Sequence, residues 1–87
     1  MPSKYNLVHT WKDMEKTEQM NSPCWRSSVH TYPEWAAAHS AMRSAFLKYA
    51  NDNAESLITC SFRCDSAYLE YADGCKEIWT IDNAREG

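Results

Sequence analysis

Four cysteines and three histidines are the side chains of this sequence that could bind a metal ion. Zinc sites usually collect such ligands in close-spaced pairs on tight turns. The closest cysteine pair, Cys60 and Cys64, lies in a segment that alternates like a strand, which places the two residues about 13 Å apart at roughly 3.3 Å per residue. Both share one face with Ile58 and Phe62, which favours small thiols buried in a core. We therefore expect no metal or other cofactor, and a zinc-stabilised module is an alternative. The possible ligands are Cys24, Cys60, Cys64, Cys75, His9, His30 and His39.

Nucleophilic catalysis is the second chemistry to consider. It needs a serine or cysteine next to a histidine in space, and no sequence motif in this chain indicates such a convergence. The chain has only two glycines, Gly74 and Gly87, so a glycine-rich phosphate-binding loop is excluded. We expect a protein that is not an enzyme.

The cysteines also bear on localisation. Four cysteines without a secretory signal pattern indicate free thiols in a reducing compartment, so we expect a cytoplasmic protein. No segment approaches the roughly 18 consecutive apolar residues of a membrane span, and we expect no membrane contact.

Aromatic side chains are the third candidate for chemistry, because an open sheet face that carries them can stack unpaired bases. Trp11, Trp25, Tyr68 and Trp79 are candidates for such a face. A nucleic-acid binder also needs a basic groove, whereas this chain has nine basic and twelve acidic residues. Direct binding of single-stranded nucleic acid is therefore an alternative hypothesis.

The same aromatic residues fit a protein interface better. One helix and one sheet face do not need eleven aromatic rings, so some should lie at the surface, where Trp and Tyr act as interface anchors. Residues 65–87 carry a net charge of −4, which is typical of a solvated sheet edge that resists aggregation. The alternative is an acidic patch that docks on a basic surface of a partner. The expected partner-binding residues are Trp11, Trp25, Tyr68, Glu70, Asp73, Glu77 and Trp79.

Two strands are predicted in the first third of the chain. Residues 4–12 alternate, with Tyr5, Leu7, His9 and Trp11 on one face, and residues 24–30 alternate in the same way. These strands should pair with each other. The polar segment 13–23 between them is predicted as a flexible loop or one weak helical turn.

One main helix is predicted over residues 34–50. Thr31 and Glu34 fit a capping box, with Pro33 in the first turn. The apolar stripe that should face the sheet consists of Trp35, Ala38, Met42, Ala45, Phe46 and Tyr49.

Three more strands are predicted after the helix, over residues 56–64, 67–72 and 75–82. Asp73-Gly74 indicates a hairpin between the last two. We favour a three-residue loop with Gly74 as the bulge, because it sets Glu70 near Lys76 and not opposite Glu77. Residues 83–87 are predicted to fray.

Residues 1–87 therefore form one small α+β domain in the order β-β-α-β-β-β, an antiparallel sheet of four to five strands with the helix on one face.

The leading hypothesis is a non-enzymatic protein that acts through protein–protein contact. Its size and style are typical of phage or mobile-element accessory factors, such as anti-CRISPR inhibitors that block a host defence protein. The partner would then be a bacterial host protein with a basic nucleic-acid-binding surface. A homodimer through the uncovered sheet face or the first strand is a further possibility.

Overall fold

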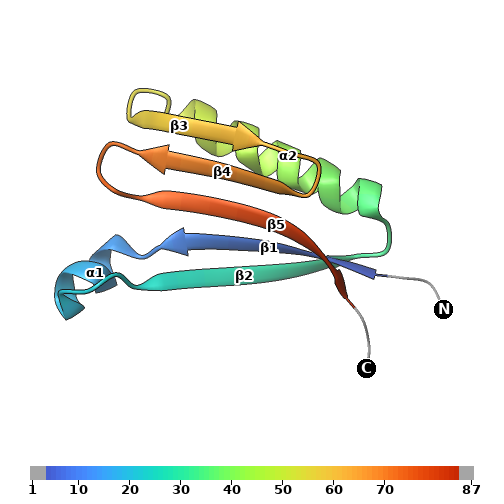
Figure 1. Ribbon diagram of the computed structural model, residues 1–87, viewed down its shortest axis with the longest axis horizontal. Helices are drawn as coiled ribbons and strands as arrows, with labels where there is room; N and C mark the ends of the chain where they lie inside the picture. Colours follow the sequence, from blue (N-terminus) through green and yellow to red (C-terminus); the bar gives the residue numbers. More distant parts are fainter. Residues whose placement is uncertain (1–3, 85–87) are drawn as a thin grey trace.

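The computed structural model describes residues 4–84, without the side chains of Met14, Glu15 and Ala84. Figure 1 shows the elements in chain order. They are β1 (Lys4–Lys12), α1 (Met14–Met20), β2 (Trp25–Tyr32), α2 (Trp35–Asp52), β3 (Leu57–Phe62), β4 (Ser66–Tyr71) and β5 (Lys76–Ala84). Asn83 and Ala84, which were predicted to fray, belong to β5, and residues 85–87 of that predicted tail lie outside the described residues.

The five strands form one antiparallel sheet in the order β2-β1-β5-β4-β3. The predicted α+β class, with one main helix and this element order, is confirmed. β1 lies inside the sheet between β2 and β5, so the expectation that the first strand could pair across a two-fold axis is wrong. β2 and β3 are the two edges.

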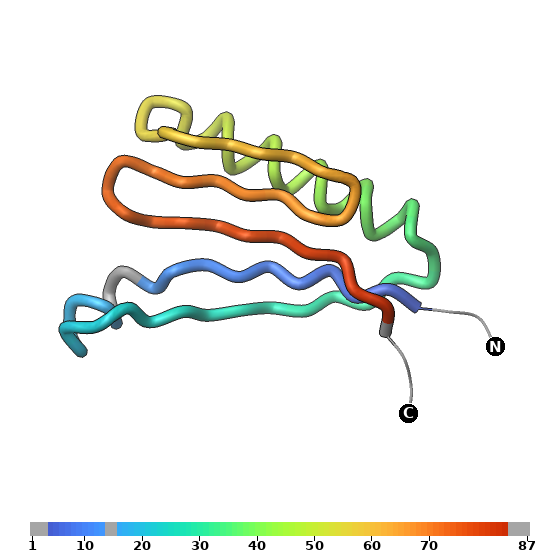
Figure 2. Tube along the Cα trace, in the orientation of Figure 1, coloured from blue at the N-terminus to red at the C-terminus, as the bar shows by residue number. Residues whose placement is uncertain are grey.

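The chain joins these two edges through α2, which follows β2 directly and precedes β3. Crossing from β2 to β3 means crossing four strand spacings, about 19 Å at roughly 4.8 Å each. The 18 residues of α2 span about 27 Å at 1.5 Å per residue, which is enough for a diagonal path over one face. The tube in Figure 2 shows this path behind the sheet.

The core lies between α2 and this covered face. Ala38 and Met42 are fully buried on the helix, and their spacing of four residues puts them on one stripe. The small alanine lets the helix approach the strands closely. The buried sheet residues beneath the helix are Leu7, Ala67, Leu69, Tyr71, Trp79 and Ile81.

The start of α2 differs from the prediction. Glu34 is the N-cap and makes no side-chain capping bond, so the predicted capping box is wrong. β2 continues to Tyr32, which pairs with Tyr5 of β1, and Thr31 donates a hydrogen bond to Asn6 Oδ1 at 2.7 Å. Pairing with β1 therefore holds Thr31 in the sheet and delays the helix.

The segment 13–23 contains more structure than a single turn. Met14–Met20 form the seven-residue helix α1. The Asp13 carboxylate accepts a hydrogen bond from the Lys16 backbone N–H at 3.0 Å, and Asn21 ends the helix in the left-handed conformation at φ 53°. Asp13 and Asn21 are typical capping residues, so the sequence did carry the signal for this helix.

The predicted register of the β4–β5 hairpin is confirmed. Glu70 lies opposite Lys76, and the loop contains three residues. Gly74 adopts φ +92°, which is a conformation that favours glycine. The register puts Glu70 and Glu77 on opposite faces of the sheet.

The cysteines near β3 are not buried. Cys60 lies opposite Leu69 of β4 and so shares the covered side of the sheet, but α2 does not extend over β3 far enough to cover it. Cys64 lies in the turn after β3, and both thiols are exposed. The prediction that these two cysteines are core residues is therefore wrong.

Met42→Ala should lower the free energy of unfolding by about 2–5 kcal/mol, because it leaves a cavity at the centre of the core. Urea denaturation followed by tryptophan fluorescence would measure the change. Arg43→Ala, one residue further along α2 and exposed, is the matched control and should change stability by less than about 0.5 kcal/mol. Equal effects of the two variants would contradict this assignment of the core.

Candidate functional site

The sheet has a second face, opposite α2, that no described element covers. Strand alternation and the observed register place its residues, and we call this surface the open face. Figure 1 views the molecule with α2 behind the sheet, so the open face points toward the reader. Its central residues are Val8, Thr10, Trp25, Ser27, Val29, Tyr68, Glu70, Ile78 and Thr80.

Apolar side chains on the open face form two cross-strand pairs and one separate tryptophan. Val29 of the edge strand β2 is 54% exposed and lies opposite Val8 of β1. Trp25 is 46% exposed and lies at the start of β2, with Ser27 between it and Val29. In the middle of the sheet, Tyr68 lies opposite Ile78. Serine and threonine occupy most of the positions between and around these groups, so apolar contacts alternate with hydrogen-bonding groups.

The Tyr68 hydroxyl donates a hydrogen bond to the Glu70 carboxylate at 2.6 Å. This bond, together with partial burial and the nearby negative charge, raises the pKa of Tyr68. The hydrogen bond holds the Tyr68 side chain beside Glu70 on the open face.

Three of the seven predicted partner-binding residues lie on the open face: Trp25, Tyr68 and Glu70. Asp73 is exposed in the β4–β5 turn, where it accepts a hydrogen bond from the Cys75 backbone N–H at 2.9 Å. Trp11, Glu77 and Trp79 lie on the covered face.

The expected surface position of Trp79 is wrong, because its side chain is only 1% exposed. It lies opposite both His9 and Ala67, under α2. Trp11 is half-buried on the same face. Trp79 shares strand parity with Ile81, and Trp11 shares parity with Leu7, so each tryptophan follows its apolar neighbour to the covered side.

The predicted acidic patch does not form as one surface. Glu70 is on the open face, Asp73 is in a turn, and Glu77 is 9% exposed on the covered face. These three carboxylates therefore do not together support charge steering toward a basic partner, because they lie on different surfaces.

A buried polar network accounts for Glu77, and the sequence interpretation missed it. Its carboxylate accepts a hydrogen bond from the Tyr71 hydroxyl through Oε2, and Oε1 lies 3.0 Å from His9 Nε2. His9 stacks on Trp79, with ring centroids 4.6 Å apart and an interplanar angle of 7°. Burial and the bond to Glu77 raise the pKa of Tyr71 well above its ordinary value. The signal in the sequence was Glu77 at the same strand parity as Trp79 and Ile81.

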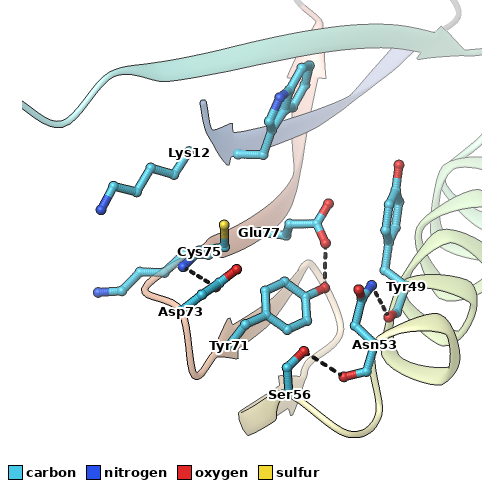
Figure 3. A pocket seen from close by; sticks show the side chains of 10 residues that line it. Lys12, Tyr49, Asn53, Ser56, Tyr71, Asp73, Cys75 and Glu77 are labelled. Carbon is cyan, nitrogen blue, oxygen red and sulfur yellow. Dashed lines mark hydrogen bonds between the residues drawn. The ribbon is translucent and has the colours of Figure 1, made fainter. Parts of the chain in front are cut away.

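A cavity of about 230 Å³ opens beside this network (Figure 3). Small-molecule sites usually enclose at least about 300 Å³, so this one is small. Both oxygens of Glu77 already have partners, and burial raises the pKa of the Cys75 thiol, which makes it a weak nucleophile. The lining residues are Trp11, Lys12, Tyr49, Asn53, Ser56, Tyr71, Asp73, Cys75, Lys76 and Glu77.

Possible metal ligands do not gather at one place in the described part of the chain. Within residues 4–84, no three His, Cys, Asp or Glu side chains lie close enough together to hold an ion. The zinc-module hypothesis therefore has no assembled ligand set in this part of the chain.

No helix within residues 4–84 is long and apolar enough to cross a membrane.

Comparison of the chain with family models, with characterised proteins and with solved structures finds no match.

Tyr71→Phe should lower the free energy of unfolding by about 1–3 kcal/mol at pH 7, because Glu77 loses a hydrogen-bond donor while it stays buried. The folded protein holds the Tyr71 proton more tightly than the unfolded chain does. The contribution of this bond is therefore complete below pH 10, the ordinary tyrosine pKa, and falls as pH rises above it.

Urea denaturation at several pH values between 8 and 11 would test both effects. Wild-type stability should fall more steeply above pH 10 than that of the Tyr71→Phe variant. Tyr32→Phe is the control, because it removes a tyrosine hydroxyl where β2 pairs with Tyr5, at the end of β1 away from Glu77. Its stability should fall with pH as steeply as that of the wild type. Parallel curves for wild type and Tyr71→Phe would refute the role of this network.

Proposed function

We propose that this protein is a non-enzymatic binding protein that acts through contact with another protein, and that the open face is its contact surface. The observation that carries the proposal is the exposure of Trp25 and Val29 on a sheet face that no described element covers. Tryptophan is among the residues most enriched at the energetic centres of interfaces.

The chemistry of the open face supports a protein partner. Apolar groups centred on Trp25 and Tyr68 are surrounded by hydroxyl side chains, which is the mixture of apolar anchors and polar surroundings found in protein interfaces. Both residues sit on strands that are paired with their neighbours, so binding does not first have to order a loop. A rigid anchor loses little entropy when it is bound.

The proposed mode of action is steric occlusion of the partner. A standard interface covers about 800 Å² on each side, which a sheet of five strands can supply. In its most specific form, the proposal is an inhibitor of phage or mobile-element type that blocks a bacterial host protein. The compact α+β sheet with exposed apolar side chains on its open face supports this form.

Trp25→Ala should weaken binding to the partner by about 2 kcal/mol or more, roughly 30-fold in affinity. The partner would be isolated from a host lysate with the wild-type protein, identified by mass spectrometry and purified. Isothermal titration calorimetry would then compare the per-site affinities of the variants.

Trp35→Ala is the matched control, because Trp35 is also an exposed tryptophan but belongs to α2 on the other side of the sheet. It should bind with wild-type affinity. If Trp25→Ala and Val29→Lys both bind as tightly as the wild type, the open face is not the contact surface.

Single-stranded nucleic acid is the second candidate, since Trp25 and Tyr68 could stack bases. It predicts oligonucleotide binding at low salt that falls steeply as salt rises and is lost in Trp25→Ala. Fluorescence anisotropy with a labelled oligonucleotide measures this directly, and the net charge of −3 favours a negative result.

A further inference from the structure

β3 is the edge of the sheet with the least protection against pairing with another strand. It is paired on one side only, with β4, and its sequence Leu57–Phe62 contains neither a charged residue nor a proline. Natural sheet edges are commonly guarded by lysine, proline, a bulge or a covering helix. A bulge lies between Leu57 and Thr59, but the register with β4 is regular from Thr59 to Phe62.

The backbone of β3 offers hydrogen bonds along this regular part. The Arg63 backbone N–H donates to Ser66 O of β4 at 2.7 Å. In an antiparallel pair every second residue points its backbone groups toward the neighbouring strand, so the amides of Ser61 and Thr59 also point toward β4. The amides and carbonyls of Cys60 and Phe62 then point outward, away from the sheet. These groups form a free edge for another strand.

Apolar side chains flank this free edge. Three of the seven exposed large hydrophobic residues lie here, and we call them together the β3–α2 margin: Trp35, Ile58 and Phe62. The Phe62 ring contacts His39 of α2 at a centroid distance of 5.5 Å, and His39 stacks on Trp35 at 4.7 Å. Ile58 is the most exposed of the set at 62%.

We propose that β3 pairs antiparallel with β3 of a second copy of this chain, which forms a two-fold homodimer with one continuous ten-stranded sheet. The two-fold axis stands perpendicular to the sheet, so both α2 helices stay on the same face. The two β3–α2 margins then meet at the junction and cover one another. The two open faces also join into one surface.

The charges that flank β3 favour a second copy of this chain as the strand that pairs with it. The exposed Glu55 precedes β3 and the exposed Arg63 follows it. Antiparallel pairing brings each Glu55 to the end of the strand where the partner's Arg63 lies, twice in the dimer. Parallel pairing would set like charges side by side at both ends.

Sedimentation-velocity and light-scattering experiments over a range of concentrations test this proposal on the full chain. The wild-type protein should approach twice its monomer mass of 10.1 kDa. Ile58→Lys should raise the dimer dissociation constant at least about tenfold, because it puts two lysines at the junction. Val29→Lys, an equally exposed valine on the open face, is the control and should leave the dimer unchanged. Circular dichroism would establish that each variant folds.

A charge-swap cycle distinguishes this interface from a general effect on stability. Glu55→Arg and Arg63→Glu should each weaken the dimer, about tenfold, and the double variant should restore it to within about twofold of the wild type. A wild-type protein that stays monomeric up to about 1 mM would overturn the proposal. So would a dimer that resists Ile58→Lys, or a double variant that is weaker than both single ones.

A protein that stays monomeric and binds an unrelated extended peptide at β3 would also overturn the homodimer. The β3 edge would then pair with a strand from another protein. Failure of this proposal is distinguishable from failure of the proposed function, because the two use different surfaces. Ile58→Lys tests only the edge of the sheet, and Trp25→Ala tests only the open face.

Discussion

One connection constrains the entire molecule: α2 must carry the chain from one edge of the sheet to the other. It leaves β2 at one edge and delivers the chain to β3 at the opposite edge, so it has to cross the strands between them. Because it is the only long helix in the described residues, all the burial it provides falls on one face. The aromatic core around Trp79 and Met42 lies under this diagonal. The open face, together with Ile58 and Cys60 of β3, is what this single helix leaves exposed.

The buried polar network shows how this arrangement fixes the register of the sheet. Glu77 of β5 needs a partner from β1, His9, and a partner from β4, Tyr71. A shift of β5 by one residue would carry Glu77 to the open face and leave Tyr71 and His9 without it. A buried carboxylate with two hydrogen-bond partners therefore selects one alignment of the three strands. Apolar side chains alone would specify this alignment less strictly.

The sequence predicts local structure well here and predicts burial poorly. Strand alternation, the helix stripe and the Asp73-Gly74 hairpin are local signals, and each led to the correct element or register. Which face of a strand lies under the helix depends on the whole topology, and for that reason Trp79 was placed at the surface and Cys60 in the core. The capping box at Thr31 failed because strand pairing with β1 competed for the same residues. The pairing of Glu77 with His9, which are 68 positions apart, has no local signature at all.

The two edges of the sheet differ in a way that limits growth. β2 carries Arg26 and ends directly before Pro33, which cannot donate a backbone hydrogen bond. β3 has no charged residue or proline within Leu57–Phe62, and the charged Arg63 lies directly after its end. An isologous contact at β3 uses up the unguarded edge of both molecules and leaves only guarded edges outside. Assembly by strand addition would therefore terminate at two subunits and not propagate into a fibril.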